Sequence, residues 1–135
     1  MGTFRLEVLT PEKRFFEGDV EMVIVRSVDG DLGILRGHMP MVAPIGIGSL
    51  RILTGGQWRE AFISGGFMEV KPESTLILSD AVEWPEEIDI KRAEAARERA
   101  LERLRQKRSR EEYIRSQVAL ARALNRLKIA RKYRE

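Results

Sequence analysis

The stretch Pro85-Glu86-Glu87-Ile88-Asp89-Ile90-Lys91-Arg92-Ala93 marks the point at which the chain changes character. All 11 glycines and all 5 prolines lie in residues 1–85, and none follows. Residues 1–85 carry 8 basic and 12 acidic side chains, a net charge of −4, whereas residues 86–135 carry 16 and 9, a net charge of +7. The sequence therefore predicts two domains, residues 1–85 and residues 86–135.

The bulk composition excludes several classes of protein. The 135 residues are 43% hydrophobic and 33% charged, which is enough apolar material for a small core. Cysteine is absent, so disulfides and thiolate metal sites are excluded. No apolar run approaches the roughly 18 residues of a membrane-spanning helix, and the N-terminus lacks a signal-peptide core. We expect a soluble chain that meets a membrane only through a partner.

The first domain shows the pattern of a β protein. Short segments of alternating apolar and polar residues are separated by turn signals every eight to twelve residues, a pattern typical of an antiparallel sandwich or small barrel. We therefore predict an N-terminal antiparallel β-sandwich. The expected strands are Thr3–Leu9, Val20–Val28, Leu50–Leu53, Trp58–Ile63, Phe67–Val70 and Thr75–Leu78, and the expected turns are Thr10–Glu12, Asp29–Asp31, Gly55–Gly56, Ser64–Gly66 and Lys71–Glu73.

One stretch of this domain, Gly33–Pro44, fits the β pattern poorly because it mixes turn formers with apolar residues. Two interpretations stay open: a long connection that folds back on the core, or an apolar loop offered to another protein. His38, the single histidine, lies in this stretch beside Met39 and Pro40. We predict a turn residue with a hydrogen bond rather than a catalytic base or a metal ligand.

The second domain predicts two helices and hence an α+β chain that ends in an antiparallel two-helix hairpin. Helix one is expected from Ile88 to about Lys107, and helix two, with Ser109 as its N-cap and Glu112 as its capping-box partner, to about Lys132. Their apolar stripes are Ile90, Ala93, Ala96, Ala100, Leu101 and Leu104 in helix one, and Ile114, Val118, Ala121, Leu124 and Leu127, with Leu120 and Ala123 beside them, in helix two.

The seam between the two helices is rich in alanine, with four alanines in each helix. Alanine favours helix but buries little surface, at ~0.8 kcal/mol per buried CH₂. Each helix should therefore survive separation better than their pairing does, and we predict a hairpin that opens. The alternative is a rigid appendage packed on the sheet.

Three motifs in order resemble the epsilon subunits of bacterial F-type ATP synthases: Glu21–Val25, the run Gly30-Asp-Leu-Gly-Ile-Leu-Arg-Gly-His-Met-Pro40, and Ser64-Gly-Gly-Phe-Met-Glu-Val70. The resemblance covers essentially the whole chain. It implies a central-stalk rotor subunit whose sandwich lies beside the gamma subunit and on the ring of c subunits. It also implies that the tail restrains ATP hydrolysis when it extends toward the catalytic alpha and beta subunits. The implied ring-facing residues are Asp31, Leu32, Gly33, Ile34, Leu35, His38 and Met39.

Ile88-Asp89-Ile90-Lys91-Arg92-Ala93 is similar to the I/L-D-x-x-R-A motif of epsilon subunits that bind ATP in the folded hairpin. The resemblance implies a regulatory ATP site, with the need for Mg²⁺ left open. Guanidinium groups from two helices can hold a triphosphate by bidentate contacts; the alternative is that they form solvated salt bridges. The implied nucleotide-binding residues are Glu83, Ile88, Asp89, Arg92, Ala93, Arg99, Arg122 and Arg126.

The resemblance therefore implies a non-catalytic subunit at the cytoplasmic face of the bacterial membrane, held there by its complex. No Gly-rich phosphate loop is present, so we expect no hydrolysis by this chain. A basic helical hairpin that binds nucleic acid is the rival interpretation. Against it, Tyr113 and Tyr133 are isolated and nine acidic residues share the tail, so no nucleic-acid partner is expected.

Overall fold

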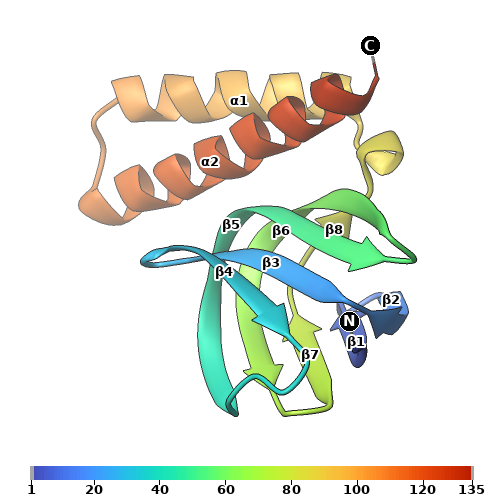
Figure 1. Ribbon diagram of the computed structural model, residues 1–135. Helices are drawn as coiled ribbons and strands as arrows, with labels where there is room; N and C mark the ends of the chain where they lie inside the picture. The colour runs from blue at the N-terminus through green and yellow to red at the C-terminus, as the bar shows by residue number, and fades with distance from the viewer. Residues whose placement is uncertain (1, 135) are drawn as a thin grey trace. The chain divides into compact units, whose positions relative to one another are not determined.

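The computed structural model describes residues 2–134, which divide into two compact units with the boundary between Glu83 and Trp84. The first unit is built from strands and the second from helices, as Figure 1 shows. The predicted α+β fold class, an N-terminal β-sandwich followed by a two-helix hairpin, is confirmed. Each unit is described separately below.

The β unit contains eight strands that are connected in one folded sheet. The order along the main path is β2-β1-β7-β6-β5-β3-β4, and β8 pairs with β6 beside this path. The strand bounds are β1 Phe4–Leu9, β2 Arg14–Val20, β3 Met22–Ser27, β4 Gly30–Leu35, β5 Met41–Thr54, β6 Gln57–Val70, β7 Ser74–Leu78 and β8 Val82–Glu83.

One pairing departs from the expected antiparallel pattern. β1 lies parallel to β7, from Arg5 opposite Ser74 to Leu9 opposite Leu78, whereas every other pair among the described strands is antiparallel. A parallel partner cannot be joined by a tight turn, and these two strands are separated by most of the unit. No local turn signal could have revealed this pairing.

The two longest strands, β5 and β6, hold the unit together and appear in Figure 1 as long curved ribbons. They pair without a register shift from Met41–Val70 to Thr54–Gln57, and the predicted Gly55–Gly56 turn joins them with positive φ at both glycines. The predicted turn at Ser64–Gly66 is wrong, because these residues lie inside β6. Gly65 and Gly66 have φ of +97° and +145°, so the strand bends without leaving its ladder.

The bend in β6 also explains why Gly66 is a glycine. A Cβ at this position would overlap the carbonyl oxygen of Leu78 on the neighbouring strand β7. Before the bend, Phe62 and Ile63 pair with β8; after it, Phe67–Val70 pair with β7. The bend therefore lets one strand take part in both layers around a core whose large, fully buried members are Phe62, Leu6, Ile34, Leu50, Ile52, Ile63, Met68 and Ile77.

The helical unit begins with a short 3₁₀ turn, η1 (Pro85–Glu87), followed by α1 (Ile90–Arg105) and α2 (Arg110–Tyr133). Helix α1 starts two residues later than predicted, because the carboxylate of Asp89 caps it by accepting the N–H of Arg92 at 3.0 Å. The predicted N-cap of α2 is confirmed, since Ser109 Oγ accepts the N–H of Glu112 at 3.2 Å. The Glu112 carboxylate lies near Arg108 instead of completing a capping box.

The predicted seam is right for α1 and partly wrong for α2. Ala93 and Ala100 are buried as expected. In α2, Ile114 and Leu124 are half-exposed, so neither belongs to the main buried face. The buried stripe runs through Ser116, Ala123, Leu127 and Ala130, at helical spacings of seven, four and three. Because α2 carries apolar residues on more than one side, periodicity alone could not choose between them.

The link between the helices contains one residue in the left-handed conformation, Lys107, with φ of +48°. Glycine commonly takes this place at a helix C-terminus, but this half of the chain has none.

Within residues 2–134, neither α1 nor α2 is long and apolar enough to cross a bilayer.

Candidate partner surface and ligand site

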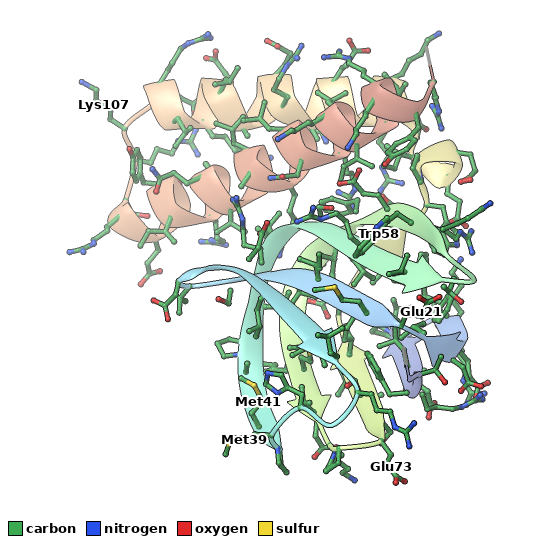
Figure 2. The ribbon with its side chains drawn as sticks, viewed as in Figure 1. Glu21, Met39, Met41, Trp58, Glu73 and Lys107 are labelled. Atoms are coloured by element: carbon green, nitrogen blue, oxygen red, sulfur yellow. The ribbon has the colours of Figure 1, made fainter. Side chains whose placement is uncertain are left out.

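The first candidate surface is the end of the β unit that holds the connection from β4 to β5. Only Arg36–Pro40 connect the two strands, so Gly33–Pro44 is neither a long loop nor a fold-back segment. The N–H of Gly37 donates to the carbonyl of Pro72 at 2.9 Å, which fixes this connection beside the β6–β7 turn. Figure 2 shows Met39 and Glu73 at this same end.

The predicted ring-facing residues differ in accessibility. Asp31–Leu35 belong to β4 rather than to a loop, and Ile34 is buried in the core, so its side chain is closed to a partner. Leu35 is exposed, His38 is half-buried, and Met39 is 79% exposed. The His38 ring nitrogen Nδ1 lies 3.0 Å from the carbonyl oxygen of Met39, which confirms the predicted turn residue with a hydrogen bond. The accessible apolar groups of this set are therefore Leu35 and Met39.

A second apolar surface, which the sequence analysis missed, lies on the outer face of β5, β6 and β7. Val42, Phe67 and Leu78 are 70%, 61% and 48% exposed. Phe67 pairs with Pro44 on one side and Leu78 on the other, so these side chains form a row across three strands. Val42 lies two residues from Pro44 and hence on the same face.

A hollow of about 520 Å³ adjoins this outer face. Its lining includes the apolar residues Phe67, Leu78 and Pro11 and the polar residues Ser64 and Ser79. Ser64 Oγ accepts the N–H of Ala81 at 3.1 Å, and Ser79 Oγ donates to the carbonyl of Ala81 at 3.2 Å. An exposed apolar row beside a hollow that contains polar groups is the arrangement expected of a protein-binding surface.

The residues of the predicted ATP motif lie at the start of α1. Ile88 and Ala93 are buried, whereas Asp89 and Arg92 are exposed. Asp89 holds the Arg92 backbone as the helix cap, so one of its oxygens already has a structural role. Glu83 belongs to β8 and to the other compact unit.

An ion pair between the helices fixes their axial alignment. Arg131 Nη2 lies 3.2 Å from Glu94 Oε2, so residue 131 of α2 is level with residue 94 of α1. In antiparallel helices the same offset places Arg126 level with Arg99 and Arg122 level with position 103. At ~1.5 Å rise per residue, the candidate arginines extend ~16 Å along the hairpin from Arg92 to Arg122. This arrangement suits an elongated ligand rather than a compact anion.

Three of the candidate arginines lack the glutamate partners that several other arginines of the hairpin have. Arg97, Arg105, Arg108 and Arg131 each lie within 4.0 Å of a glutamate. Among residues 2–134, the guanidinium groups of Arg92, Arg99 and Arg122 make no hydrogen bond or ion pair. The salt-bridge alternative therefore fails for these three side chains, which remain available to an anionic ligand.

A hollow in the helical unit overlaps this set only in part. It measures about 600 Å³ and is lined by Arg99 together with Glu102, Arg103, Gln106, Arg108, Glu112, Arg115 and Ser116. Arg92, Arg122 and Arg126 do not line it. We give more weight to the row of unpartnered guanidinium groups, because the hollow opens widely to solvent and its wall includes two carboxylates. Sequence reasoning missed Arg103 and Arg115, which no motif distinguished.

No group of three or more His, Asp or Glu side chains within residues 2–134 is arranged to hold a metal ion. The structure thus shows a β-sandwich with exposed apolar surfaces and a helical hairpin with several unpartnered arginines, the architecture of a two-domain subunit of a larger assembly.

Family models match both parts of the chain. Residues 3–85 match the β-sandwich domain of the ATP synthase delta/epsilon chain, and residues 86–131 match its long α-helix domain.

Relatives of known name agree with this assignment. The chain is 61% identical to the ATP synthase epsilon chain of Caldanaerobacter subterraneus subsp. tengcongensis, over 98% of this chain and 97% of that one. It is 58% identical to that of Caldicellulosiruptor saccharolyticus, over 96% and 94%. The chain belongs to the ATP synthase delta/epsilon family, as an epsilon subunit of the F-type ATP synthase. The family resemblance expected from its motifs is therefore confirmed.

The fold also recurs in more distant structures. A chain in the structure of the Euglena gracilis mitochondrial ATP synthase, described as OSCP/F1/c-ring in rotational state 1, matches with a TM-score of 0.79 at 24% identity. That match covers 93% of this chain and 79% of the other. A chain from the Tetrahymena thermophila mitochondrial ATP synthase central stalk matches with a TM-score of 0.64 at 12% identity, over 96% and 97%. At these identities the likeness concerns the fold alone.

Proposed function

We propose that this subunit is part of the central stalk, where it couples the catalytic head to the c-ring and restrains ATP hydrolysis through a hairpin whose closed form binds ATP. The β unit contacts the gamma subunit and the c-ring, and the opened hairpin reaches the alpha and beta subunits. The chain itself is not an enzyme. It lies at the cytoplasmic face of the bacterial membrane as a peripheral member of the complex.

Two surfaces of the β unit support its role in assembly. Leu35 and Met39 at the β4–β5 connection are the accessible apolar groups for the c-ring. The row of Val42, Phe67 and Leu78 offers a second, broader surface, which we assign to gamma. A subunit that joins the c-ring to gamma requires a separate surface for each of them.

The observation that carries the ATP proposal is the row of arginines without carboxylate partners. Arg92, Arg99 and Arg122 extend along both helices, and a triphosphate supplies the anionic oxygens that they lack. Arg126, level with Arg99, is the fourth candidate arginine but already has an interaction of its own. Ile88 and Ala93 supply buried apolar packing beside Asp89, whose free oxygen is available to the adenine amino group or the ribose. Mg²⁺ would reach this site as part of the nucleotide.

ATP would regulate the hairpin by mass action, because only the closed form brings the two helices together. A ligand at 100 times its dissociation constant stabilises the state that it binds by ~2.7 kcal/mol. The seam to be stabilised is built largely from Ala93, Ala100, Ala123 and Ala130, which bury little surface. High ATP would therefore keep the hairpin closed and hydrolysis permitted, and low ATP would release the basic helices toward acidic segments of the catalytic subunits.

Calorimetric titration of the full chain with ATP tests the site. Arg92→Gln and Arg99→Gln should each weaken binding about tenfold or more, since a hydrogen bond to a charged group contributes ~1.5–3 kcal/mol. Arg105→Gln is the matched control, because Arg105 already pairs with Glu102 at 3.0 Å. Equal ATP affinity in all three variants would contradict the site assignment. No heat of binding in the parent chain would exclude ATP as the ligand of this site.

A second measurement tests the brake. Reconstituting the ATP synthase with a chain that stops after residue 83 should raise ATP hydrolysis relative to the full chain, and the difference should shrink as ATP rises. Unchanged hydrolysis at low ATP would contradict the regulatory role. Because the boundary between the compact units follows Glu83, this truncation leaves β8 and its pairing with β6 in the chain.

A further inference from the structure

The last described residue of the chain, Arg134, reaches back to the segment where the helical unit begins. Its Nη2 lies 3.0 Å from the carbonyl oxygen of Pro85, 2.8 Å from that of Glu86 and 2.7 Å from that of Ile88. The two hydrogens of this nitrogen are thus shared among three acceptors. These contacts join positions 46 to 49 residues apart in the sequence.

Two of the three acceptors, the carbonyls of Glu86 and Ile88, receive no backbone N–H within residues 2–134, whereas the Pro85 carbonyl already accepts the N–H of Ile88 at 3.3 Å. Residues Pro85–Glu87 form one 3₁₀ turn, whose last carbonyls have no following helical N–H because Asp89 starts a new helix. A cation favours such carbonyls, and a basic residue at a helix C-terminus usually contacts those of its own helix. Here the C-terminal arginine of α2 caps the turn before α1 instead.

The position of this contact gives it a role in hairpin closure. Every bond from Arg134 to residues 85–88 exists only while the end of α2 lies against the start of the unit. The Arg131–Glu94 ion pair is the neighbouring tie between α2 and α1. The Ala-rich seam between these elements is weak in packing, so polar ties at its end have a proportionately large effect on the closed state.

We propose that Arg134 is a latch that holds the hairpin closed without nucleotide, by fastening the C-terminus of α2 to the carbonyls of residues 85–88. The latch sets the ratio of open to closed chains on which ATP then acts. It rests on the proposed opening of the hairpin but not on ATP binding. Ile88 belongs to the latched segment and Asp89 follows it directly. Because both are also candidate nucleotide-binding residues, the latch and the nucleotide favour the same closed state.

Thiol reactivity of the full chain can measure this ratio, because the sequence contains no cysteine. Ala123→Cys in α2 or Ala100→Cys in α1 places one small, buried thiol in the seam, and its labelling rate by a disulfide reagent without nucleotide reports opening. We expect Arg134→Ala to accelerate labelling at both positions about tenfold, equivalent to about 1.4 kcal/mol. Arg134→Lys should recover part of the loss, since one ammonium group can reach fewer of the three carbonyls.

Three controls separate the latch from other causes. Lys128→Ala removes an exposed cation of the same helix and should leave both labelling rates unchanged. Ala61→Cys, buried in the β unit, should also be unaffected by Arg134→Ala, which excludes general unfolding. Equal rates in Arg134→Ala and Lys128→Ala chains at positions 100 and 123 would overturn the latch, because fraying confined to the last turn cannot reach either thiol.

Adding ATP distinguishes this proposal from the regulatory site. If ATP slows labelling in both the parent and Arg134→Ala chains, the latch and the nucleotide act independently on one equilibrium, as proposed. If ATP has no effect but Arg134→Ala still accelerates labelling, the latch stands and the ATP proposal fails. If ATP slows labelling but Arg134→Ala does not accelerate it, the latch fails and the ATP proposal stands.

Discussion

The β unit and the helical hairpin are stabilised by different kinds of core. In the β unit, Phe62, Leu50, Ile52 and Met68 are fully buried, and each contributes a large apolar surface. In the helical unit, about half of the buried apolar positions are alanines, and the larger buried side chains are Ile88, Leu127 and Ile129. Burial of a large side chain stabilises by ~1.5–3 kcal/mol, whereas a methyl group contributes ~0.8 kcal/mol. The comparison teaches that a conformational change would begin in the hairpin while the β unit stays folded.

The largest effect is expected from truncating the centre of the β core. Phe62→Ala removes a fully buried ring and leaves a cavity, which should cost about 3–5 kcal/mol of unfolding free energy. Urea unfolding of the full chain, followed by Trp fluorescence, measures this loss. Ala123→Gly in the hairpin should cost only about 1 kcal/mol, mainly through helix propensity. A greater loss in Ala123→Gly than in Phe62→Ala would reverse the comparison.

The bend of β6 should be the next most sensitive point of the β unit. Gly66→Ala forces a side chain into φ of +145° and against the Leu78 carbonyl, so a loss of at least about 1–3 kcal/mol is expected. Gly18→Ala is the matched control in strand β2, because its new Cβ meets only Phe16 at ordinary distance. Thermal unfolding of both variants decides the point: similar midpoints would mean that the bend can relax.

A smaller effect is expected at the start of the hairpin. Asp89→Ala removes the N-cap of α1 and should cost about 1 kcal/mol of helix stability, while Asp89→Asn keeps an acceptor and should cost much less. Helical circular dichroism as a function of urea measures the cap, and ATP titration of the Asn variant then measures the carboxylate charge alone. Equal losses of helix stability in the Ala and Asn variants would show that the negative charge near the helix N-terminus, rather than the capping hydrogen bond, stabilises α1.

The smallest effect concerns the surface of the β unit at acid pH. The hydrogen bond from Arg5, at 2.6 Å, and the nearby Arg14 lower the pKa of Glu17. A carboxyl with a lowered folded pKa stabilises above its unfolded pKa of about 4.3, and that contribution disappears as the pH falls through the folded value. Glu17→Gln should therefore lower stability slightly at pH 7, and the difference from the parent chain should vanish once the pH lies below the folded pKa.

The control for this pH dependence is Glu12→Gln, since Glu12 makes no ion pair within residues 2–134. Its stability difference from the parent should stay near zero across the same range. The exposed position of the Arg5–Glu17 pair keeps the expected Glu17 effect small, because solvent screens such pairs. A Glu17 difference that grows toward acid pH would contradict the assigned direction of the shift.

Much of the helical unit could be predicted because its signals are local. Ser109 caps α2, as its position before a run without helix breakers predicted. A local signal also succeeded in the β unit, where the Gly55–Gly56 pair forms the expected two-residue turn. The Asp89 cap was missed because helix one was predicted to begin at Ile88, two residues before its observed start, which placed Asp89 inside the helix. The sequence named the candidate site as a set of arginines, and that assignment stays a prediction. Which of these arginines have partners depends on neighbours that the sequence does not order in space.

The sequence by itself determined the change from strands to helices after Pro85, the charge difference between the two parts, and the family. These properties depend on glycine, proline and charge along the chain, which act over a few residues. The tertiary structure alone decided that β1 lies parallel to β7, that Gly66 bends a strand rather than ending it, and that Arg134 reaches residues 85–88. Each of these depends on backbone groups brought together from distant positions, and a hydrogen bond between them leaves no local pattern in the sequence.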